Sequence, residues 1–484
     1  MISVWPIRNV VGFLLMIVGG MMLLCIPFSL SFGDADWKAL LIASGITAGA
    51  GFMARQFKPK KENISVRKRE GYLIVACGWI AMVLFSALPY TLSGVLENPV
   101  DAFFESISGM TTTGATIFED IEALPKGILF WRSLTQWIGG MGIIVLTVAL
   151  FPLLGIGGIE LFVAEAPGPT SDKIHPRIQQ TAKSLWQIYV SLTGILLLIL
   201  WGAGMTFYDA VNHALTTMAT GGFSTKNASI AAYDLPQIQY PILFFMFLAG
   251  TNYTVIYWSL QGKLKKVWSS DEFRVYLSFV GIIGTIVACS IMYHTNMGIE
   301  ASIRTAFFQV VSLVTTTGYV SADYTLWGPG TTIIFFGLLF VGASAGSTSG
   351  GIKLVRHWVF LKNTILEFRR LLHPRAVLPI KLNGVSISPK IMSHILVFLL
   401  LYLALFILGS FAVSIMGLDF ETATSSVATA LGNVGPGIGK IGPTDNFAWL
   451  PNNVKITLSF LMLLGRLELF TILVLFTPYF WKSN

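Results

Sequence analysis

Four short runs of the chain end in glycine, and each closes a fourteen-residue pattern that opens with Asp or Thr and has Ala in second place. The runs are Thr112-Thr113-Gly114, Thr220-Gly221-Gly222, Thr316-Thr317-Gly318 and Asn433-Val434-Gly435. Backbone carbonyls in such runs can replace the water around a dehydrated cation, because glycine puts no side chain into a narrow lumen and tolerates positive φ. We therefore predict that the four runs are extended along one axis, with their carbonyls inward, as ion-binding residues.

A packing role is the alternative for these residues, since Gly and Thr also let membrane helices approach closely. For a single copy, packing would be the better interpretation. The four copies occupy residues 101–114, 209–222, 305–318 and 422–435, and each lies between long apolar stretches. Four equivalent elements around one axis favour a pore over four unrelated packing contacts.

The elements that position these runs are predicted to be short helices. The four copies open with residue types that cap helix N-termini, namely Asp101, Asp209, Thr305 and Thr422. A helix of about eleven residues covers roughly 16 Å, half of the hydrocarbon thickness, so the chain has to turn back inside the membrane. The helix C-termini then point to the pore centre, where their partial negative charge favours a cation.

The composition places the chain in a membrane. Hydrophobic residues make up 54% of the 484 residues and charged residues 12%, which is more apolar surface than a soluble domain can bury. Ten apolar stretches of bilayer length are expected, at 9–30, 38–54, 71–93, 128–154, 186–207, 237–261, 273–293, 331–361, 391–416 and 453–480. The first is predicted to be a retained anchor, because its apolar run is longer than that of a signal peptide.

These patterns together predict an all-α polytopic membrane protein, with four pseudo-symmetric helix/pore-loop/helix repeats around a central pore and two additional N-terminal transmembrane helices. The N-terminal unit is assigned to residues 1–70 and the repeats to 71–183, 184–270, 271–387 and 388–484. Six scattered His and three Cys residues show no ligand spacing, and the spans lack the grouped acids and bases of an active site. We expect no enzyme activity, no bound cofactor and no nucleic-acid partner.

Basic residues set the expected orientation. Residues 55–70 and 353–390 are rich in Lys and Arg, which favours the cytoplasmic side for both segments. Counting spans from these segments puts both termini inside the cell and the four glycine-ending runs outside. The net charge of +8 is thereby explained as a topology signal and not as a nucleic-acid patch.

The 95–127 segment, in contrast, is acidic. It contains Glu97, Asp101, Glu105, Glu119, Asp120 and Glu122 against a single Lys126. Two interpretations remain open: negative charge that concentrates cations at a pore mouth, or a solvated loop that happens to be acidic.

Several stretches resemble one known family. The strings TTTGAT, TGGFST, TTTGYV and NVGPG, one in each span-loop-span unit, are similar to those of the Trk/Ktr/HKT superfamily of potassium transporters. WRSLTQWIGGMGIIVL, GASAGSTSGG, HPRAV and LGRLELFTILVLFTP fit the same family, and the two extra N-terminal spans resemble its Trk-type pore subunits. The resemblance covers essentially the whole chain.

The resemblance implies a potassium pathway within one polypeptide, with potassium as the substrate bound at the four glycine-ending runs. It also implies a homodimer in membrane lipid, gated by a cytosolic, nucleotide-binding (TrkA-like) partner subunit. In this family Gly at the first filter position accompanies potassium permeation and Ser accompanies sodium selectivity, and this chain has Gly114. Thr220 and Gly432 depart from the residues usual at their positions, which leaves fine selectivity open.

A polar, flexible interruption marks the eighth apolar stretch. A segment so rich in Gly, Ser and Thr cannot continue as a helix against lipid and should line a cavity. By resemblance, a gating loop beneath the filter is formed by Gly346, Ser347, Thr348, Ser349, Gly350 and Gly351. A close-packing seam between helices is the alternative.

Arg466 lies near the middle of the 453–480 stretch, where a cation costs about 2.5–3.5 kcal/mol unless it faces water or a partner. Glu468 is two residues away and so faces elsewhere. We expect Arg466 to project beneath the filter as an electrostatic barrier near the gating loop. A structural ion pair with another helix is the alternative.

The function these observations favour is potassium uptake through a channel-like pore in the bacterial inner membrane. An inside-negative potential supplies about 2.3 kcal/mol per unit charge per 100 mV, which is enough to accumulate cations. The alternative is symport by an ion-coupled (proton or sodium) carrier, a class that usually shows paired half-chain repeats and intramembrane carboxylates.

Overall fold

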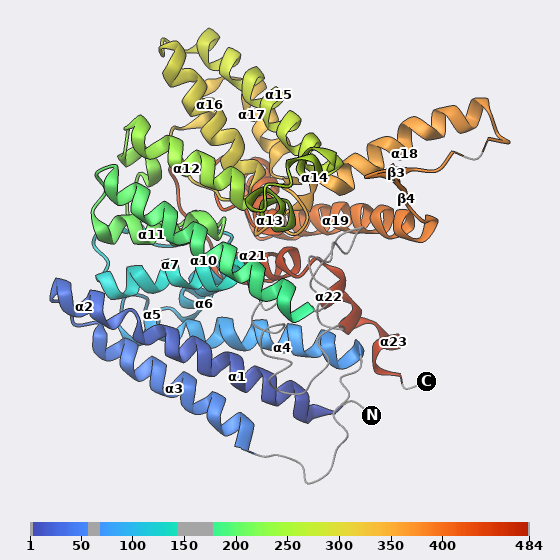
Figure 1. The fold of residues 1–484 in the computed structure, drawn as a ribbon. Helices are drawn as coiled ribbons and strands as arrows, with labels where there is room; N and C mark the ends of the chain where they lie inside the picture. The colour runs from blue at the N-terminus through green and yellow to red at the C-terminus, as the bar shows by residue number, and fades with distance from the viewer. Residues whose placement is uncertain (1–2, 57–67, 143–177, 377, 483–484) are drawn as a thin grey trace.

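The computed structural model describes residues 3–56, 68–142, 178–376 and 378–482, and these residues are mostly helical (Figure 1). Among them, six helical segments are long and apolar enough to cross a membrane, and two further spans result if each sharply bent helix pair is counted as one. The chain is therefore a multi-pass, all-α membrane protein, as its composition predicted.

The N-terminal unit braces the first repeat. It consists of α1 (Val4–Leu23), α2 (Ile26–Phe32) and α3 (Trp37–Gln56), and α1 packs along α3 and α4. In the turn between α2 and α3, the Asp34 carboxylate accepts a hydrogen bond from the Lys126 amide at 2.7 Å, and Asp36 accepts one from Ile128 at 2.8 Å. These two carboxylates satisfy amides at the start of α7 that have no partner within the helix.

Each repeat contains a long first helix, a short helix and a second helix. The first helices are α4 (Lys68–Ser86, followed by α5, Leu88–Leu92), α10 (Ile178–Gly202), α15 (Asp271–His294) and α19 (Pro389–Ile415). The short helices are α6 (Pro99–Met110), α11 (Phe207–Met218), α16 (Ile299–Val314) and α20 (Phe420–Gly432). The second helices are α7 (Lys126–Gly140), α12 (Pro236–Ala249), α17 (Pro329–Leu338) and α21 (Asn452–Arg466). The predicted fold class is thereby confirmed.

The remaining elements are short connections, apart from α18. They are η1 (Ser229–Ala232), α13 (Tyr253–Leu260), α14 (Leu264–Ser269), η2 (Tyr324–Trp327), β1 (Val341–Gly342), β2 (Ile352–Lys353), α18 (Leu354–Leu372), β3 (Lys381–Leu382), β4 (Val385–Ser386), α22 (Phe470–Leu473), η3 (Val474–Phe476) and α23 (Pro478–Trp481). Strands β1 and β2 pair in parallel, and β3 and β4 form an antiparallel hairpin. The far half of α18 and this hairpin form an arm that projects from the body (Figure 1).

The short helices begin earlier than the sequence analysis predicted. The observed caps are Asn98, Thr206 and Asp419, whose side chains accept from the amides of Val100, Asp209 and Thr422, while α16 follows Gly298 without a side-chain cap. The predicted caps Asp101, Asp209 and Thr422 lie in the first turn of their helices, and Thr305 lies in the second. Several residue types can cap a helix, so the shared pattern located the helices but not their first residues.

Three of the second helices, α12, α17 and α21, are interrupted within the described residues. The axis turns by 109° between α12 and α13 and by 107° between α21 and the α22–η3 segment, so the predicted spans 237–261 and 453–480 are each broken. The predicted interruption of the eighth span is present, because α17 ends at Leu338 and α18 begins at Leu354. Residues 143–154 of the fourth predicted span lie outside the described residues. The hydropathy averaged over each bent segment stays high although Thr251, Asn252, Arg466 and Glu468 lie at the bends, which is why hydropathy alone does not reveal the breaks.

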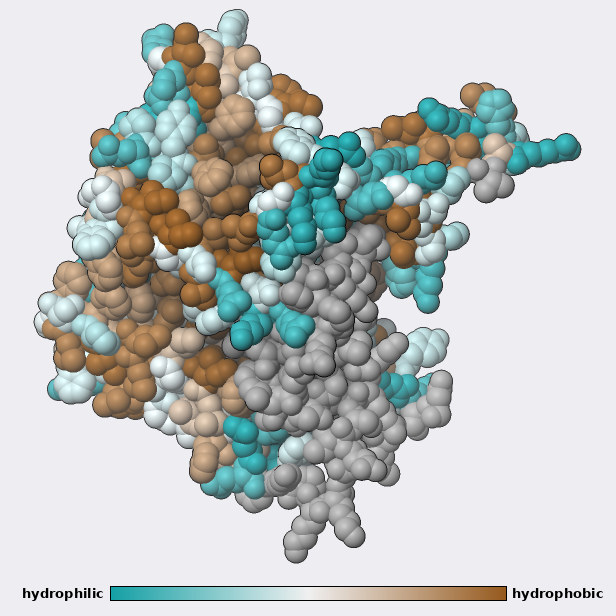
Figure 2. Space-filling model, viewed as in Figure 1, coloured by the Kyte–Doolittle hydropathy of each residue, from teal (hydrophilic) through white to brown (hydrophobic). Residues whose placement is uncertain are grey.

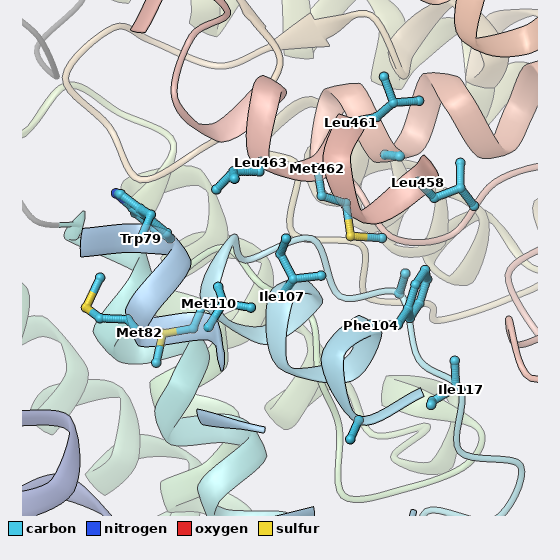
Figure 3. Packing of buried hydrophobic residues seen from close by; sticks show 14 of the residues in the cluster. Trp79, Met82, Phe104, Ile107, Met110, Ile117, Leu458, Leu461, Met462 and Leu463 are labelled. Carbon is cyan, nitrogen blue, oxygen red and sulfur yellow. The ribbon is translucent and has the colours of Figure 1, made fainter. Parts of the chain in front are cut away.

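The four repeats close on themselves. Helix α7 packs against α6 and α11, α12 packs against α11 and α16, and α21 packs against α20 and α6. Figure 3 shows the last contact, where Leu458 and Met462 of α21 lie over Phe104 and Ile107 of α6 within one buried apolar cluster. The fourth repeat thus meets the first, as an arrangement around one axis requires.

The two ends of the chain lie on the same side of the molecule. The Ser3 amide donates to the Glu70 carboxylate at 2.7 Å, and the Arg69 guanidinium donates to the Lys482 carbonyl at 2.6 Å. Figure 2 shows a broad apolar surface over the helices of the body, while hydrophilic side chains gather around α14 and on the α18 arm. Residues 57–67 of the predicted basic segment lie outside the described part of the chain.

Candidate functional site

The last glycines of the four repeats lie in one closed ring. A Cβ atom added to any of them would lie 1.9–2.6 Å from a backbone carbonyl oxygen of the next repeat. These contacts join Gly114 to Gly221, Gly222 to Thr317, Gly318 to Val434, and Gly435 to Thr113. The order runs from repeat 1 through 2, 3 and 4 back to 1, so the four residues, hereafter the ring glycines, surround one axis. All four have positive φ, between 74° and 96°. A side chain at any of them would require the close carbonyl to shift and is disfavoured by the backbone conformation.

The four short helices reach the ring through the same terminal hydrogen bonds. In each repeat the amide just before the ring glycine donates to the carbonyl five residues earlier, at 2.8–3.0 Å. These bonds run from Thr113 to Ser108, Gly221 to Thr216, Thr317 to Ser312, and Val434 to Thr429. The amide one residue earlier donates to the carbonyl three residues before it in all four repeats. This pair of bonds is the Schellman ending, which satisfies the last carbonyls of a helix and turns the chain away from its axis.

The residue two positions before each ring glycine is left-handed and not extended, which corrects the prediction. Values of φ between 52° and 55° are found at Thr112, Thr220, Thr316 and Asn433. Such a residue at the end of a helix is usually Gly or Asn, and a β-branched side chain there costs on the order of 1–2 kcal/mol. Strain of this kind persists only where the surrounding structure enforces it, and it concentrates at functional sites.

Side chains of the short helices brace the backbone just beyond the ring. The amide three residues past the ring glycine donates to Glu105 in repeat 1 at 3.0 Å, to Gln309 in repeat 3 at 3.0 Å and to Ser425 in repeat 4 at 2.6 Å. In repeat 2 the ring of His213 bonds the Ser224 hydroxyl at 2.9 Å instead. Three residue types therefore accept from the same backbone amide, and in repeat 2 a histidine contacts the side chain of Ser224.

Glu105 also forms a buried ion pair. Its carboxylate lies 2.5 Å from Nε of Arg132 on α7, and both side chains are at most 2% exposed. Arg132 in addition donates to the Ser224 carbonyl at 3.1 Å and stacks over the Phe223 ring at 3.6 Å. The arginine thus ties the short helix of repeat 1 to the backbone just past the ring glycine of repeat 2.

Two residues of the predicted gating loop contact the left-handed residues directly. The Gly350 amide donates to the Thr316 hydroxyl at 2.7 Å, and the Thr348 hydroxyl lies 3.3 Å from that of Thr220. A Cβ added to Gly350 would lie 2.8 Å from the Cβ of Asn433. The loop therefore packs against three of the four left-handed residues.

The loop is also fixed to the broken second helices. The Thr348 hydroxyl donates to the carbonyls of Met218 and Ala249 at 3.1 and 3.2 Å, the latter at the end of α12. The Gly346 carbonyl accepts from the amide of Tyr253, the first residue of α13. These bonds hold the loop at the point where α12 breaks.

The other predicted loop residues do not contact the left-handed residues through any described hydrogen bond. Ser347 bonds the Ser344 carbonyl and the Ser349 hydroxyl, at 2.6 and 2.8 Å. Ser349 accepts from the Lys353 ammonium, and Gly351 packs on Gly342 where β1 meets β2. These residues stabilise the loop internally.

Arg466 is the last residue of α21, beside the bend, and not in the middle of a straight span as predicted. Its guanidinium donates to the carbonyl of Thr348 in the loop at 2.9 Å and to that of Gly140 at the end of α7 at 3.0 Å. Nearby, the Glu468 carboxylate pairs with Arg356 on α18, and both side chains are less than a fifth exposed. Arg466 and Arg356 thus join the third repeat to the fourth on either side of the break.

Part of the acidic 95–127 segment is neutralised by ion pairs. Asp101 lies 2.7 Å from the Lys455 ammonium, Glu105 pairs with Arg132, and Glu122 lies 3.4 Å from Lys226. Asp120 accepts a hydrogen bond from the Asn227 amide at 2.9 Å, and this bond lowers the pKa of the Asp120 carboxyl below its usual value. The negative field expected from the residue count is therefore smaller in the folded chain.

Sequence reasoning missed the residues that brace the ring from α7. Arg132 was not singled out, and Glu105 was counted only as part of an acidic segment. An ionisable residue in an apolar stretch is expensive to bury and calls for a partner, so Arg132 within 128–154 carried a usable signal. The partner itself could not be identified, because the ion pair joins two helices whose contact depends on the fold.

Comparison with known proteins agrees with this architecture. The family model described as "TrkH: Cation transport protein" matches residues 42–286 and 290–483. The chain is 40% identical to the Trk system potassium uptake protein TrkH of Escherichia coli K12, over 99% of both chains. It is 36% identical to the Trk system potassium uptake protein TrkG of the same strain, over 88% of both chains.

A solved structure shows the same fold. The crystal structure of the potassium transporter TrkH from Vibrio parahaemolyticus matches with a TM-score of 0.89 and 34% identity, over 99% of this chain and 100% of that one. The resemblance inferred from the sequence is confirmed, and the family is one of transport proteins and not of enzymes. The chain belongs to the TrkH family of cation transport proteins.

Proposed function

We propose that this protein takes up potassium through a pore whose selectivity filter is the ring of four glycines and the residues before them. The filter residues are Thr112, Thr113, Gly114, Thr220, Gly221, Gly222, Thr316, Thr317, Gly318, Asn433, Val434 and Gly435. The observation that carries the proposal is the closed order of contacts, in which each ring glycine meets the backbone carbonyl before the next one. Relatives over the full length of the chain carry the name potassium uptake protein.

The chemistry around the ring suits a dehydrated cation. Four helix C-termini converge there, and each contributes partial negative charge. Thr112 Oγ1 and Asn433 Oδ1 are buried and have no hydrogen-bond partner among the described residues. Oxygens left unpaired at such a position are candidates to bind an ion, since burying them without any partner costs about 1–3 kcal/mol each.

The proposed gate is the loop of Gly346 to Gly351 together with Arg466. The loop packs against the bases of three filter segments, and the Arg466 guanidinium reaches the Thr348 carbonyl within it. A cation entering from the filter would meet this positive charge at close range, in a setting where charge interactions are strong. Opening the pathway therefore requires the loop and Arg466 to move away together.

The cellular setting is proposed from the same family assignment. We place the protein in the bacterial inner membrane, with both termini and the α18 arm in the cytoplasm and the ring glycines nearer the outer face. Potassium is the substrate and no cofactor is required. A homodimer and a cytosolic nucleotide-binding, TrkA-like partner complete the proposed assembly, and signals from the partner would reach the gating loop through α18, which directly follows β2.

Passive conduction is proposed over ion-coupled symport. Among the carboxylates of the short helices, Glu105 is fully buried and forms an ion pair with Arg132, so we assign it a structural role. The competing proposal, a proton- or sodium-coupled carrier, predicts movement of a second ion with each potassium. Measuring proton and sodium movement during potassium uptake separates the two.

The test is isotopic potassium and sodium flux into proteoliposomes that contain the purified chain, with and without a TrkA-like partner. We expect potassium-selective, voltage-dependent flux without proton movement. Gly114→Ser is the comparison variant, because its side chain would start 2.2 Å from the Gly221 carbonyl oxygen and must distort the ring. Complete absence of passive potassium flux under both conditions would refute the proposal.

A further inference from the structure

The second repeat differs from the others at the residue before its ring glycine. Repeats 1, 3 and 4 have a residue with a β-branched side chain there, namely Thr113, Thr317 and Val434, whereas repeat 2 has Gly221. Gly221 is not among the residues with positive φ, so backbone conformation does not explain the glycine. The explanation lies in the side chain packed behind it.

Gln136 on α7 occupies the space that a side chain at position 221 would need. A Cβ added to Gly221 would lie 2.3 Å from Cδ and 2.4 Å from Oε1 of Gln136. The Gln136 side chain is fully buried between α7 and the second filter segment. Gly221 and Gln136 therefore fit only as a pair.

The amide of Gln136 bonds the backbone on both sides of a ring glycine. Its Nε2 donates to the Gly221 carbonyl at 2.5 Å, and its Oε1 accepts from the Phe223 amide at 3.1 Å. The backbone carbonyl and amide leave only one orientation for the side-chain amide. Gln136 thus bonds one backbone carbonyl and one backbone amide, as a neighbouring β-strand does, and it fixes the peptide planes before and after Gly222.

The equivalent residues in two other repeats can be identified from the packing of α7, α12 and α21. Gly139 approaches the Met110 carbonyl as Gly465 approaches that of Leu431, and both carbonyls lie four residues before their ring glycines. The residues three positions before Gly139 and Gly465 are Gln136 and Met462. Met462 is thereby the counterpart of Gln136 in repeat 4.

The same argument identifies the counterpart in repeat 2. Gly140 approaches Ala219 as Gly250 approaches Thr315, and each contacted residue lies three positions before a ring glycine. Four positions before Gly140 and Gly250 lie Gln136 and Met246. Helices α7, α12 and α21 each pack on the short helix of the following repeat, so Met246 lies on the helix that faces repeat 3 and Met462 on the helix that faces repeat 1. The second-helix residue opposite the filter is thus methionine where the filter residue is Thr317 or Thr113, and glutamine where it is Gly221.

We propose that Gln136 is a positioning residue for ion selectivity, which holds the second filter segment through Gly221 and Phe223 in place of the Met/Thr pairing found at two of the other interfaces. This inference rests on the proposed filter. Among the described residues, the Gly221 carbonyl is the one ring carbonyl that accepts a hydrogen bond from a side-chain amide. Loss of that restraint lets the carbonyl reorient and weakens the distinction between potassium and sodium.

The test compares potassium and sodium flux in proteoliposomes for the parent chain, Gln136→Met, Gln136→Glu, Gly221→Thr and the double variant Gln136→Met/Gly221→Thr. In Gln136→Met, loss of both hydrogen bonds should lower the potassium-to-sodium flux ratio on the order of tenfold. Gln136→Glu keeps the acceptor for Phe223 but sets a carboxylate oxygen against the Gly221 carbonyl oxygen, so it should lower the flux ratio at least as much as Gln136→Met. Gly221→Thr alone should lose most flux, and the double variant should recover toward the parent because it reproduces the Met/Thr pairing of repeats 1 and 3.

The outcomes separate this inference from the proposed function. A potassium-selective parent whose flux ratio is unchanged in both Gln136 variants, with all proteins monodisperse, would overturn the role of Gln136 and leave the filter standing. A double variant no better than Gly221→Thr would also overturn the pairing. A parent without passive flux would overturn both proposals together.

Discussion

The buried ion pair between Glu105 and Arg132 gives the sharpest stability prediction. In Arg132→Met the Glu105 carboxylate keeps its bond from Ile117 but loses its counter-ion in a site with no exposed surface. Breaking one side of such a pair costs about 3–5 kcal/mol, because a charge is left buried without compensation. The lost bond to the Ser224 carbonyl adds about 1 kcal/mol.

A second substitution should recover most of this loss. Glu105→Gln keeps an acceptor for the Ile117 amide and removes the charge, so Arg132→Met/Glu105→Gln lacks the buried unpaired carboxylate. We expect the double variant to regain more than half of the lost stability, because replacing a whole buried pair by neutral groups is often close to neutral. The remaining deficit reflects the Ser224 contact, which the double variant cannot restore.

The assay is the fraction of monodisperse protein left after heating in detergent, measured as an apparent Tm for parent, single and double variants. Arg274→Met is the matched control, because Arg274 pairs with Asp271 but is 54% exposed, and exposed pairs contribute about 0–1 kcal/mol. The expected order of stability is parent and control, then double, then Arg132→Met. A double variant as unstable as Arg132→Met would refute the reasoning, since it would show that the charge left behind is not what destabilises the single variant.

Three further predictions concern the ring glycines, the proposed gate at Arg466 and the acidic 95–127 segment. Gly222→Ala should abolish flux or expression, because its Cβ would lie 1.9 Å from the Thr317 carbonyl oxygen. The control Gly94→Ala should keep flux, because Gly94 has nearly the same φ of 75° but open space around it. Equal flux in the two variants would contradict the ring packing. Arg466→Ala should raise potassium flux in the absence of the partner, because it removes the positive charge and the bond to the Thr348 carbonyl, and unchanged conductance would exclude the barrier role. Asp120→Asn should reduce flux more at about 0.01 M than at about 0.15 M salt, where the screening length falls from roughly 30 to 8 Å. Since the Asp120 pKa is lowered, this carboxylate should stay charged from pH 8 down to pH 5, and flux lost over that range in the parent but not in Asp120→Asn would contradict this expectation.

The repeat and the membrane class could be predicted from the sequence because both are properties of local pattern. The fourfold recurrence located all four short helices, and the glycine at the end of each copy located the ring. The apolar stretches gave the long helices α15 and α19 to within two residues at each end, whereas α10 begins eight residues earlier than its predicted stretch and ends five residues earlier. These features depend on residue order and hydropathy, which the sequence states directly.

The breaks and the bracing contacts could not be predicted, because they depend on which helices meet. The bends after α12 and α21 occur within stretches whose averaged hydropathy stays high, so the few polar residues at each turn did not indicate a break. Thr112, Thr220 and Thr316 were expected to be extended so that their carbonyls face the pore axis, and β-branched residues ordinarily avoid the left-handed region that they adopt. The Schellman ending and the packing of the neighbouring repeats impose that conformation, and neither is visible in one segment alone.

The central claim is that the four ring glycines and the residues before them bind potassium on a common axis. The most direct measurement is the anomalous scattering of rubidium in crystals grown with rubidium in place of potassium. The claim predicts a rubidium peak on the axis enclosed by Gly114, Gly222, Gly318 and Gly435, and loss of that peak in Gly114→Ser. Rubidium density confined to other parts of the molecule, in protein that still transports potassium, would contradict it.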